Sequence, residues 1–434
     1  MKQKLRTWIP VGLCAAAAVI AFLRTRPVAA HRGTPLPLAA GTPGGAPTSR
    51  DGLATTIAAL EQRLQAEPDN AKAAARLAEA LVRQARATSN GGLAVRAEAA
   101  LRTALQAGPN YEAQRMLGTV LASQHRFREA IAAAEQARAM EPADAWNEGV
   151  IGDAHLELGE YEAAFDAFDR MVQRRPTAAA YARASYAREL QGDLAGALRL
   201  MQMAAEATTS HDPESQAWHY AQLGDLYFQM GRLSDAEREY GRADFTFNGH
   251  PHAIAGLARV DAARGDLAAA LARYASLEAK GALPEHLARM AEIEQALGRP
   301  DAARRHFALA EQGWRTDSPE PAHLARLIAR DRARAKDALA IAEKAAVMRQ
   351  DIFTMDAVAW AAFQAGDLAR AQDAAARALR TGTCDRSLLY HAAAIAAAAG
   401  DRARARDLAT RALDGNPTFD PLLAPDAKAL LATL

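Results

Sequence analysis

The sequence predicts an all-α protein, a right-handed α-solenoid (superhelix) of stacked helix pairs. An alanine recurs at intervals of about 34 residues, which is the length of a helix pair too small to bury its own apolar face. Shortly before this alanine most units carry a glycine, and further upstream they carry a small residue. The recurring alanines are Ala130, Ala164, Ala197, Ala236, Ala270, Ala303, Ala338, Ala371 and Ala405.

The other two recurring positions have clear roles in a helix pair. A glycine followed by a polar residue is typical of the turn between two helices, and it occurs at Gly159, Gly192, Gly231, Gly265, Gly298, Gly366 and Gly400. Small side chains let the paired helices approach closely, and they occur at Gly118, Gly152, Ser185, Gly224, Ala258, Ala291, Ala359 and Ala393.

These positions resemble those of the tetratricopeptide repeat superfamily. The clearest unit covers residues 111–144 and has Leu117, Gly118, Leu121, Ala130, Ala137 and Pro142 in register. The resemblance covers residues 71–417 in about ten units, of which the first and the eighth are degenerate. Arg332 stands where the eighth unit's turn glycine belongs. The resemblance is closest to bacterial exported or membrane-anchored proteins of this superfamily, and it implies no defined activity.

Composition favours a binding protein over an enzyme. Half of the residues are hydrophobic but only 6% are aromatic, which suits thin interfaces between small-residue helices. Glycine-rich phosphate loops, nucleophile elbows and metalloprotease helices are missing from the sequence, so we expect no catalytic residue and no cofactor. Four histidines (His211, His219, His250 and His252) lack carboxylate or cysteine partners at ligand spacing, so we expect no metal site. The basic stretch 326–336 contains interleaved aspartates and is read as an ordinary charged face.

Residues 1–30 differ from the rest and predict a signal peptide or a membrane anchor. Lysine and arginine precede an apolar run at 8–23, and the first fifty residues contain no acidic residue. Val28–Ala30 offers a small-residue cleavage site, whereas Arg24 and Arg26 favour an uncleaved anchor. Both alternatives place the repeats outside the cytoplasm, and the anchor would attach the chain to the membrane through residues 8–23.

The remaining boundaries follow from composition and from slips in the repeat. Residues 31–50 are rich in proline, glycine and alanine and predict a flexible linker. A first arm of repeats then covers 51–312, and a second arm covers 322–417. A break in the period at 313–321 indicates a possible hinge between them, and the leucine-rich tail 418–434 predicts a capping helix.

The resemblance implies that the first helix of each unit lines a concave groove. Aromatic and charged residues at the outward positions of these helices are therefore candidate partner-binding residues, because tryptophan, tyrosine and arginine commonly anchor recognised segments. They are Trp146, Asp153, Tyr186, Trp218, Asp225, Phe228, Arg259, Trp360, Phe363 and Tyr390.

We therefore expect a protein–protein interaction scaffold of the bacterial cell envelope, exported and either soluble or tethered to the inner membrane. Its partner would be one or more proteins that present an extended or helical segment to the groove, and no nucleic acid. A second possibility is a carrier or regulatory subunit that binds a small molecule or a polysaccharide in the same groove. Aromatic residues beside Asp153 and Asp225 suit sugars as well as peptides, so the sequence leaves both open.

Overall fold

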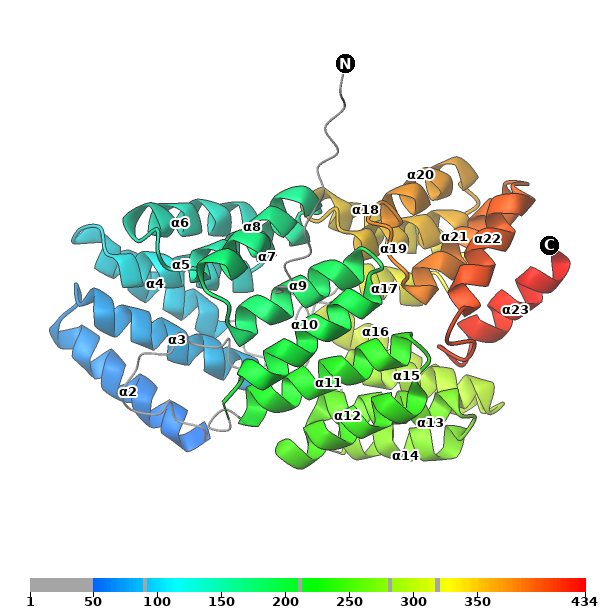
Figure 1. The fold of residues 1–434 in the computed structure, drawn as a ribbon, viewed down its shortest axis with the longest axis horizontal. Helices are drawn as coiled ribbons and strands as arrows, with labels where there is room; N and C mark the ends of the chain where they lie inside the picture. The colour runs from blue at the N-terminus through cyan, green and yellow to red at the C-terminus, as the bar shows by residue number, and fades with distance from the viewer. Residues whose placement is uncertain (1–49, 89–91, 210–212, 280–282, 317–320) are drawn as a thin grey trace, which may run out of the picture.

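A computed structural model describes residues 50–88, 92–209, 213–279, 283–316 and 321–434. Within these ranges the chain contains α-helices, one short 3₁₀ helix and no β-strand, which confirms the predicted all-α class (Figure 1). The elements are α2 (Arg50–Ala66), α3 (Ala71–Thr88), α4 (Gly92–Gln106), α5 (Tyr111–Ser123), α6 (Phe127–Met140), α7 (Trp146–Glu157), α8 (Tyr161–Arg174), α9 (Ala178–Leu190), α10 (Leu194–Ala207), α11 (Pro213–Gln229), α12 (Leu233–Thr246), α13 (Pro251–Ala263), α14 (Leu267–Glu278), α15 (Pro284–Ala296), α16 (Pro300–Thr316), α17 (Pro321–Ile328), η1 (Arg332–Arg334), α18 (Ala335–Met348), α19 (Ile352–Gln364), α20 (Leu368–Ala378), α21 (Arg386–Ala398), α22 (Arg402–Leu413) and α23 (Leu423–Thr433).

The helices form consecutive antiparallel pairs. Each odd-numbered helix from α3 to α21 packs most extensively on the even-numbered helix that follows it, and each pair packs on the next. Helix α2 lies before the first pair, and α23 lies after the last pair and contacts α21 and α22. The result is the predicted α-solenoid, with α2 at one end of the long axis and α23 at the other (Figure 1).

The recurring alanines explain how each pair closes. Each one lies one turn into the second helix of its pair, and all nine are buried. The turn glycines have φ angles between +69° and +89°, a left-handed conformation that glycine adopts at little cost. In four of these turns, the aspartate that follows the glycine caps the second helix, with its carboxylate accepting a backbone N–H.

The small residues of the first helices face large side chains of the second helices. A Cβ atom added at Gly152 would lie 2.4 Å from the ring of Phe168, and one added at Gly224 would lie 2.4 Å from the ring of Tyr240. Both rings are fully buried. These glycines therefore provide the space in which each aromatic ring packs between the two helices.

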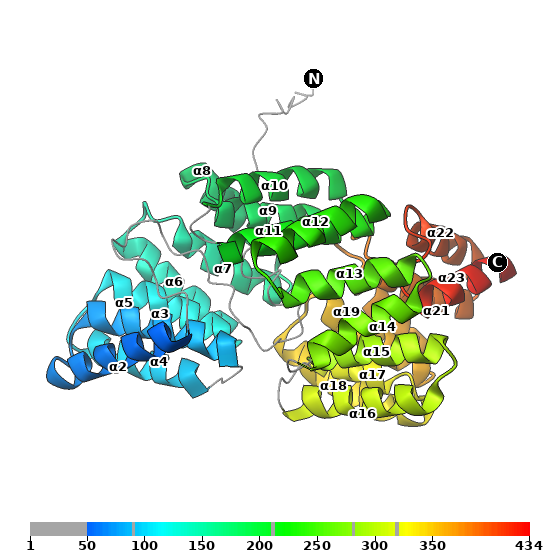
Figure 2. The same ribbon diagram turned by 90° about the horizontal axis from the view of Figure 1, so that it is seen from below.

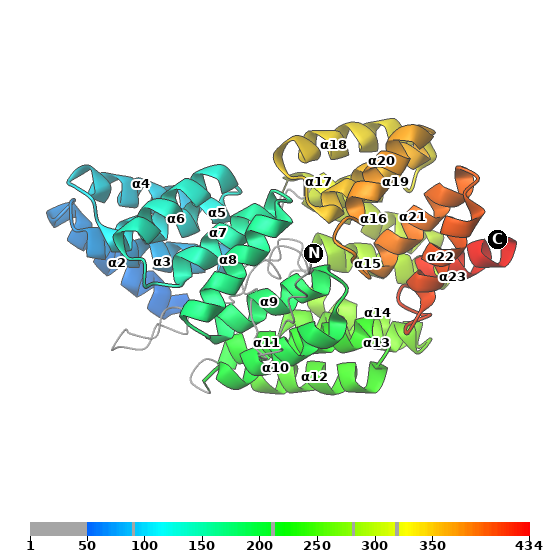
Figure 3. The same ribbon diagram turned by 45° about the horizontal axis from the view of Figure 1, so that its top comes forward.

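The helix pairs rotate about a common axis, so the molecule curves back on itself. Figure 2 shows α9–α12 along one edge of the molecule, with the N-terminal helices α2–α6 and the later helices α13–α18 on either side below them. Figure 3 shows α17–α22 turned back to face α7–α10 across the centre of the molecule. One cluster of buried apolar side chains includes residues of both regions, among them Tyr161 and Ile352.

Several boundaries predicted from the sequence fall at the edge of what the structure describes. The predicted leader at 1–30 and nearly all of the linker at 31–50 lie outside the described residues. Residues 313–316 continue α16, and 317–320 are not described. In the described part of the chain, no helix has both the length and the apolar character needed to cross a membrane. Cys384 is a free thiol, and burial raises its pKa to about 11.

Candidate functional site

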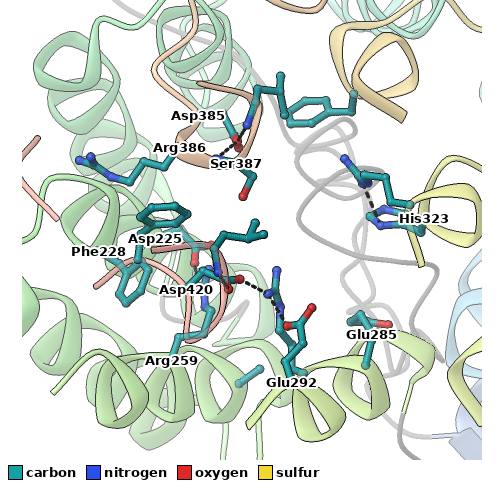
Figure 4. A pocket seen from close by; sticks show the side chains of 18 of the residues that line it. Asp225, Phe228, Arg259, Glu285, Glu292, His323, Asp385, Arg386, Ser387 and Asp420 are labelled. Atoms are coloured by element: carbon teal, nitrogen blue, oxygen red, sulfur yellow. Dashed lines mark hydrogen bonds and ion pairs between the residues drawn. The ribbon is translucent and has the colours of Figure 1, made fainter. Parts of the chain in front are cut away.

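The concave side of the superhelix encloses a cavity of about 470 Å³. Its wall is built mainly from the first helices of seven successive pairs, α9, α11, α13, α15, α17, α19 and α21. The loops before α19 and α21 and the loop between α22 and α23 complete it. Figure 4 shows charged side chains from several of these helices pointing toward one space. The cavity therefore forms only when many repeats stack into the curved superhelix, and no single repeat contains it.

Asp225 of α11 is the centre of a hydrogen-bonded network in this wall. Its carboxylate accepts from the Tyr240 hydroxyl at 2.7 Å and contacts His252 Nε2 at 2.5 Å, and it pairs with Arg259. Burial raises the pKa of Asp225, but the charges of His252 and Arg259 outweigh burial and hold that pKa below its usual range. Arg259 also lies over the ring of Phe228, 5.0 Å from its centroid, so this wall presents a guanidinium on an aromatic ring.

Helix α15, helix α17 and the turn after α17 contribute a row of arginines to the cavity. Arg289 Nη1 donates to Glu292 at 2.7 Å and to Asp420 at 2.6 Å. Arg330 donates to Gln295 outside the cavity and lies 3.6 Å from Glu292. The Arg289 side chain is 43% exposed, so the ion pairs leave part of its guanidinium facing the cavity. Opposite charges alternate along this wall, which suits a polar ligand that carries both donors and acceptors.

A second buried network lies beneath the part of the wall formed by α19 and α21. His391 Nδ1 lies 2.9 Å from Asp356, Arg326 lies 3.3 Å from the same carboxylate, and Trp360 stacks on the His391 ring at 4.1 Å. Burial raises the pKa of Asp356, but His391 and Arg326 outweigh burial and lower it. Burial and the neighbouring Arg326 charge hold the pKa of His323 well below its usual range. The His323 ring is therefore neutral near pH 7 and presents both a donor and an acceptor.

The structure brings half of the predicted groove residues to the cavity. Those that line it are Tyr186, Asp225, Phe228, Arg259 and Trp360. The others are absent from the lining: Trp146, Asp153, Trp218, Phe363 and Tyr390. Trp146 and Trp218 are buried, with the Trp146 indole donating to Thr119 at 3.2 Å. Asp153 is buried in an ion pair with Arg183.

Several residues of the cavity were not predicted from the sequence. The basic stretch 326–336 was read as a charged face, but Arg326 and Arg330 line the cavity while the rest of the stretch does not. Their spacing of four residues was a usable signal, because it brings Arg326 of α17 and Arg330 of the following turn to the same side. Of the four histidines, His252 lines the cavity, His250 caps α13 and His211 lies outside the described residues. In the described ranges, no three histidine, cysteine or acidic side chains come together as metal ligands would.

The fold and the cavity define this molecule as a helical-repeat solenoid, a class in which stacked repeats present an extended concave surface. The family model described as the tetratricopeptide repeat matches residues 115–179 and 150–213. The same alanine and glycine pattern continues through the helix pairs that follow. The tetratricopeptide-repeat resemblance predicted from the sequence is therefore confirmed for residues 115–213.

Comparisons with solved structures find other helical-repeat proteins at low identity. PilW, described as a widely conserved type IV pilus biogenesis factor, is 18% identical over 48% of this chain and 94% of its own, with a TM-score of 0.42. Human IFIT1, solved as a dimer with PPP-AAAA, is 13% identical over 76% of this chain and 78% of its own, with a TM-score of 0.48. Pseudomonas aeruginosa pilF is 13% identical over 48% of this chain and 92% of its own, with a TM-score of 0.40. The search of curated proteins gave no match. These likenesses transfer no partner or activity to this chain.

Proposed function

We propose that this chain is a protein-binding scaffold, without catalytic activity, that holds a short extended segment of a partner protein in its central cavity. The observation that carries the proposal is the cavity wall, in which seven first helices present arginine, carboxylate and histidine side chains to one space. A chain segment in extended conformation exposes its backbone donors and acceptors, which alternating charges and the neutral His323 ring can satisfy.

The polar wall of this cavity of about 470 Å³ favours an extended segment over a helix. A helix satisfies most of its backbone donors and acceptors internally, whereas an extended segment presents them to the wall.

A small molecule or a glycan is the second candidate, and the same volume favours it. Small-ligand sites commonly enclose about 300–1,000 Å³ and combine aromatic walls with a few polar groups. The cavity has this volume, and Phe228, Trp360 and Arg259 supply aromatic and polar contacts. The two candidates differ in what a covalent probe in the cavity would capture.

The test is photo-crosslinking in the producing cell. We would place benzoylphenylalanine at Phe419, which lines the cavity from the loop before α23, and in a control chain at Phe245, which is 93% exposed and lies outside the cavity. We expect a discrete protein adduct at position 419 that is missing at position 245, and its cross-linked peptide should come from an unstructured or terminal segment. A glycan or small-molecule adduct would support the second candidate. A chain that is folded but gives no specific adduct at position 419 would contradict both.

Arg330→Ala provides a matched loss-of-binding variant. Arg330 faces the cavity, whereas Arg332, two residues on, is outside the lining and bonds to Gln364. We expect Arg330→Ala to reduce the crosslink at position 419 and Arg332→Ala to leave it unchanged. Equal effects of the two substitutions would indicate that charge in general, and not the cavity, determines binding.

We also propose that the repeats lie outside the cytoplasm at a bacterial cell envelope. The basic and apolar leader at 1–30 supports this location. Protease added to spheroplasts should degrade the repeats, or the repeats should already have been released into the medium. Repeats that stay protected from the protease until the membrane is lysed would contradict the location.

A further inference from the structure

Three turns of the early repeats lie against three loops of the late repeats. The turns are those at Gly159, Gly192 and Gly231, and the loops are those at Gln350, Gly382 and Gly415. A Cβ atom added at Gly159 would lie 2.4 Å from the Gln350 carbonyl oxygen, and one added at Gly192 would lie 2.7 Å from the Gly382 carbonyl oxygen. Successive turns meet successive loops, so the two regions run in register. We call this set of contacts the closing seam.

Hydrogen bonds cross the closing seam at each of its ends. The Ile352 amide donates to the Tyr161 hydroxyl at 2.8 Å, although these residues are 191 positions apart. The Arg380 guanidinium donates to the Gly159 carbonyl at 3.1 Å and to the Gln350 carbonyl at 2.6 Å. At the other end, the side-chain amide of Asn416 donates to the Phe228 backbone carbonyl at 2.8 Å. Two of these bonds end on backbone carbonyls of the early turns, those of Gly159 and Phe228.

An ion pair and further polar contacts reinforce the same two ends of the closing seam. Arg349 lies 2.6 Å from Glu157, whose side chain is fully buried. Arg386 donates to the Gln229 carbonyl at 2.5 Å and to the Ala412 carbonyl at 3.2 Å. A buried carboxylate that has lost its arginine is costly, so the pair favours the closed arrangement.

The other turn glycines show that this contact is specific to the closing seam. A Cβ atom added at Gly265, Gly298, Gly366 or Gly400 would meet nothing within 4 Å, although each has the same left-handed φ. The turn conformation therefore accounts for glycine at those four positions. At Gly159, Gly192 and Gly231 the close approach of the other half of the chain adds a second requirement.

Fewer helix–helix contacts cross the closing seam than join neighbouring pairs within each region, although one apolar cluster, which includes Tyr161 and Ile352, spans both. Extensive helix–helix packing within the described residues is confined to helices that are neighbours or next-neighbours in sequence. Each pair therefore keeps its own neighbours when the closing seam is broken. Stability in a solenoid is close to a sum of repeat and nearest-neighbour contributions, so both regions can stay folded in an open form.

We infer that the closing seam is a latch that closes the superhelix after one turn and can release without unfolding the repeats. Gln229, Arg349, Arg386 and Asn416 belong to the closing seam and also line the cavity, so the latch forms one wall of the cavity. Release removes that wall and widens the curve. A ligand's entry through this opening rests on the proposed function, whereas the latch itself is a property of the free chain.

The test is a distance measurement across the closing seam in the full chain without ligand. Spin labels on cysteines at Arg199 of α10 and Asp373 of α20, both exposed, would report the separation by electron–electron double resonance, after Cys14→Ser and Cys384→Ser. We expect one narrow distance distribution in the parent chain. Arg380→Ala, which removes two bonds at the closing seam, and Gly192→Ala, which adds a clash, should broaden it and shift it to longer distances.

Two matched controls separate release of the latch from general damage. Gly366→Ala imposes the same backbone strain in a turn where an added Cβ atom would meet nothing within 4 Å. Arg377→Ala removes an arginine of α20 that bonds to Gln350 and pairs with Asp373, both on its own side of the closing seam. Both should keep the narrow distribution. A broad distribution in the parent, or an unchanged one in Arg380→Ala and Gly192→Ala with helicity intact by circular dichroism, would overturn the latch. Neither result depends on crosslinking at Phe419, so failure of the latch and failure of the proposed function remain distinguishable.

Discussion

At the scale of single residues, the most demanding feature is a buried ion pair between α7 and α9. Arg183 is 1% exposed, and its guanidinium donates to the two carboxylate oxygens of Asp153 at 2.9 and 2.7 Å. A third bond joins Arg183 to the Ala179 carbonyl at 3.2 Å. The bidentate geometry offsets part of the cost of taking both charges out of water.

Removing one partner of this pair should be strongly destabilising. Arg183→Met keeps most of the side-chain volume but leaves the Asp153 carboxylate buried without a counter-charge, and we expect it to cost about 3–5 kcal/mol. Urea unfolding followed by circular dichroism measures the loss. Arg183→Met combined with Asp153→Leu should recover most of it, because no buried charge then remains. A cost below about 1 kcal/mol for Arg183→Met alone would contradict the expectation.

The same pair shows why the exposure of the predicted groove residues was hard to foresee. The repeat register correctly places Asp153 and Trp146 on a first helix. Whether such a residue faces solvent depends on its neighbour in the following repeat. A long side chain from the first helix of that repeat can cover it. Arg183 occupies that space for Asp153, and its guanidinium lies 5.8 Å from the Trp146 ring centroid. Periodicity carries no information about this contact because the residue types at such positions vary between repeats.

At the scale of one helix pair, α11 and α12 provide a matched pair of glycines for a stability test. Gly224 faces the buried Tyr240 ring, whereas Gly241, on α12, has nothing within 4 Å of an added Cβ atom. Gly224→Ala should destabilise the protein by about 1–3 kcal/mol, because Tyr240 is held by Asp225 and cannot move freely. Gly241→Ala should stabilise it by about 0.5–1 kcal/mol through helix propensity.

Thermal and urea unfolding of the two variants would check both signs. The comparison controls for the loss of glycine itself, since both positions are helical. Stabilisation by Gly224→Ala would show that the Tyr240 ring moves aside more easily than its buried contacts indicate.

Helix pairs were predictable where each position of the repeat has a physical reason. The turn glycines, the buried alanines and the aspartate caps all arise from local geometry, so the sequence alone placed the pairs. The eighth unit was the difficult one because Arg332 replaces its turn glycine. There the chain shortens the first helix to Pro321–Ile328 and inserts the 3₁₀ turn Arg332–Arg334, so the break occurs without a glycine.

At the scale of the whole molecule, the closing seam could not be predicted from the repeat. A period identifies which units are neighbours, but curvature is the sum of small rotations between many pairs. The contact between Tyr161 and Ile352 depends on that sum, because these residues are 191 positions apart. The cavity has the same origin, which explains why only half of the predicted groove residues line it.

The stability of the whole chain should depend on pH through buried histidines. His219 of α11 is 2% exposed, and burial lowers its pKa from 6.5 to about 4. Because the folded pKa is the lower one, the unfolded chain binds more protons between these values, so stability falls as pH drops from about 6.5 toward 4. The lowered pKa of Asp225 affects the stability of the fold only in a more acidic pH range, below the ordinary pKa of 3.8.

Replacing His219 should therefore flatten part of the pH dependence. Between pH 7 and pH 4.5 its titration corresponds to a loss of about 2–3 kcal/mol, and His219→Phe should remove that part even if it lowers stability at pH 7 by losing the contact with Thr208. Urea unfolding at the two pH values gives the difference for each chain. His323 is also buried with a lowered pKa, so the variant should retain some dependence on pH. Identical pH differences in the parent and the variant would show that His219 takes up a proton without global unfolding, as a local opening of α11 would allow.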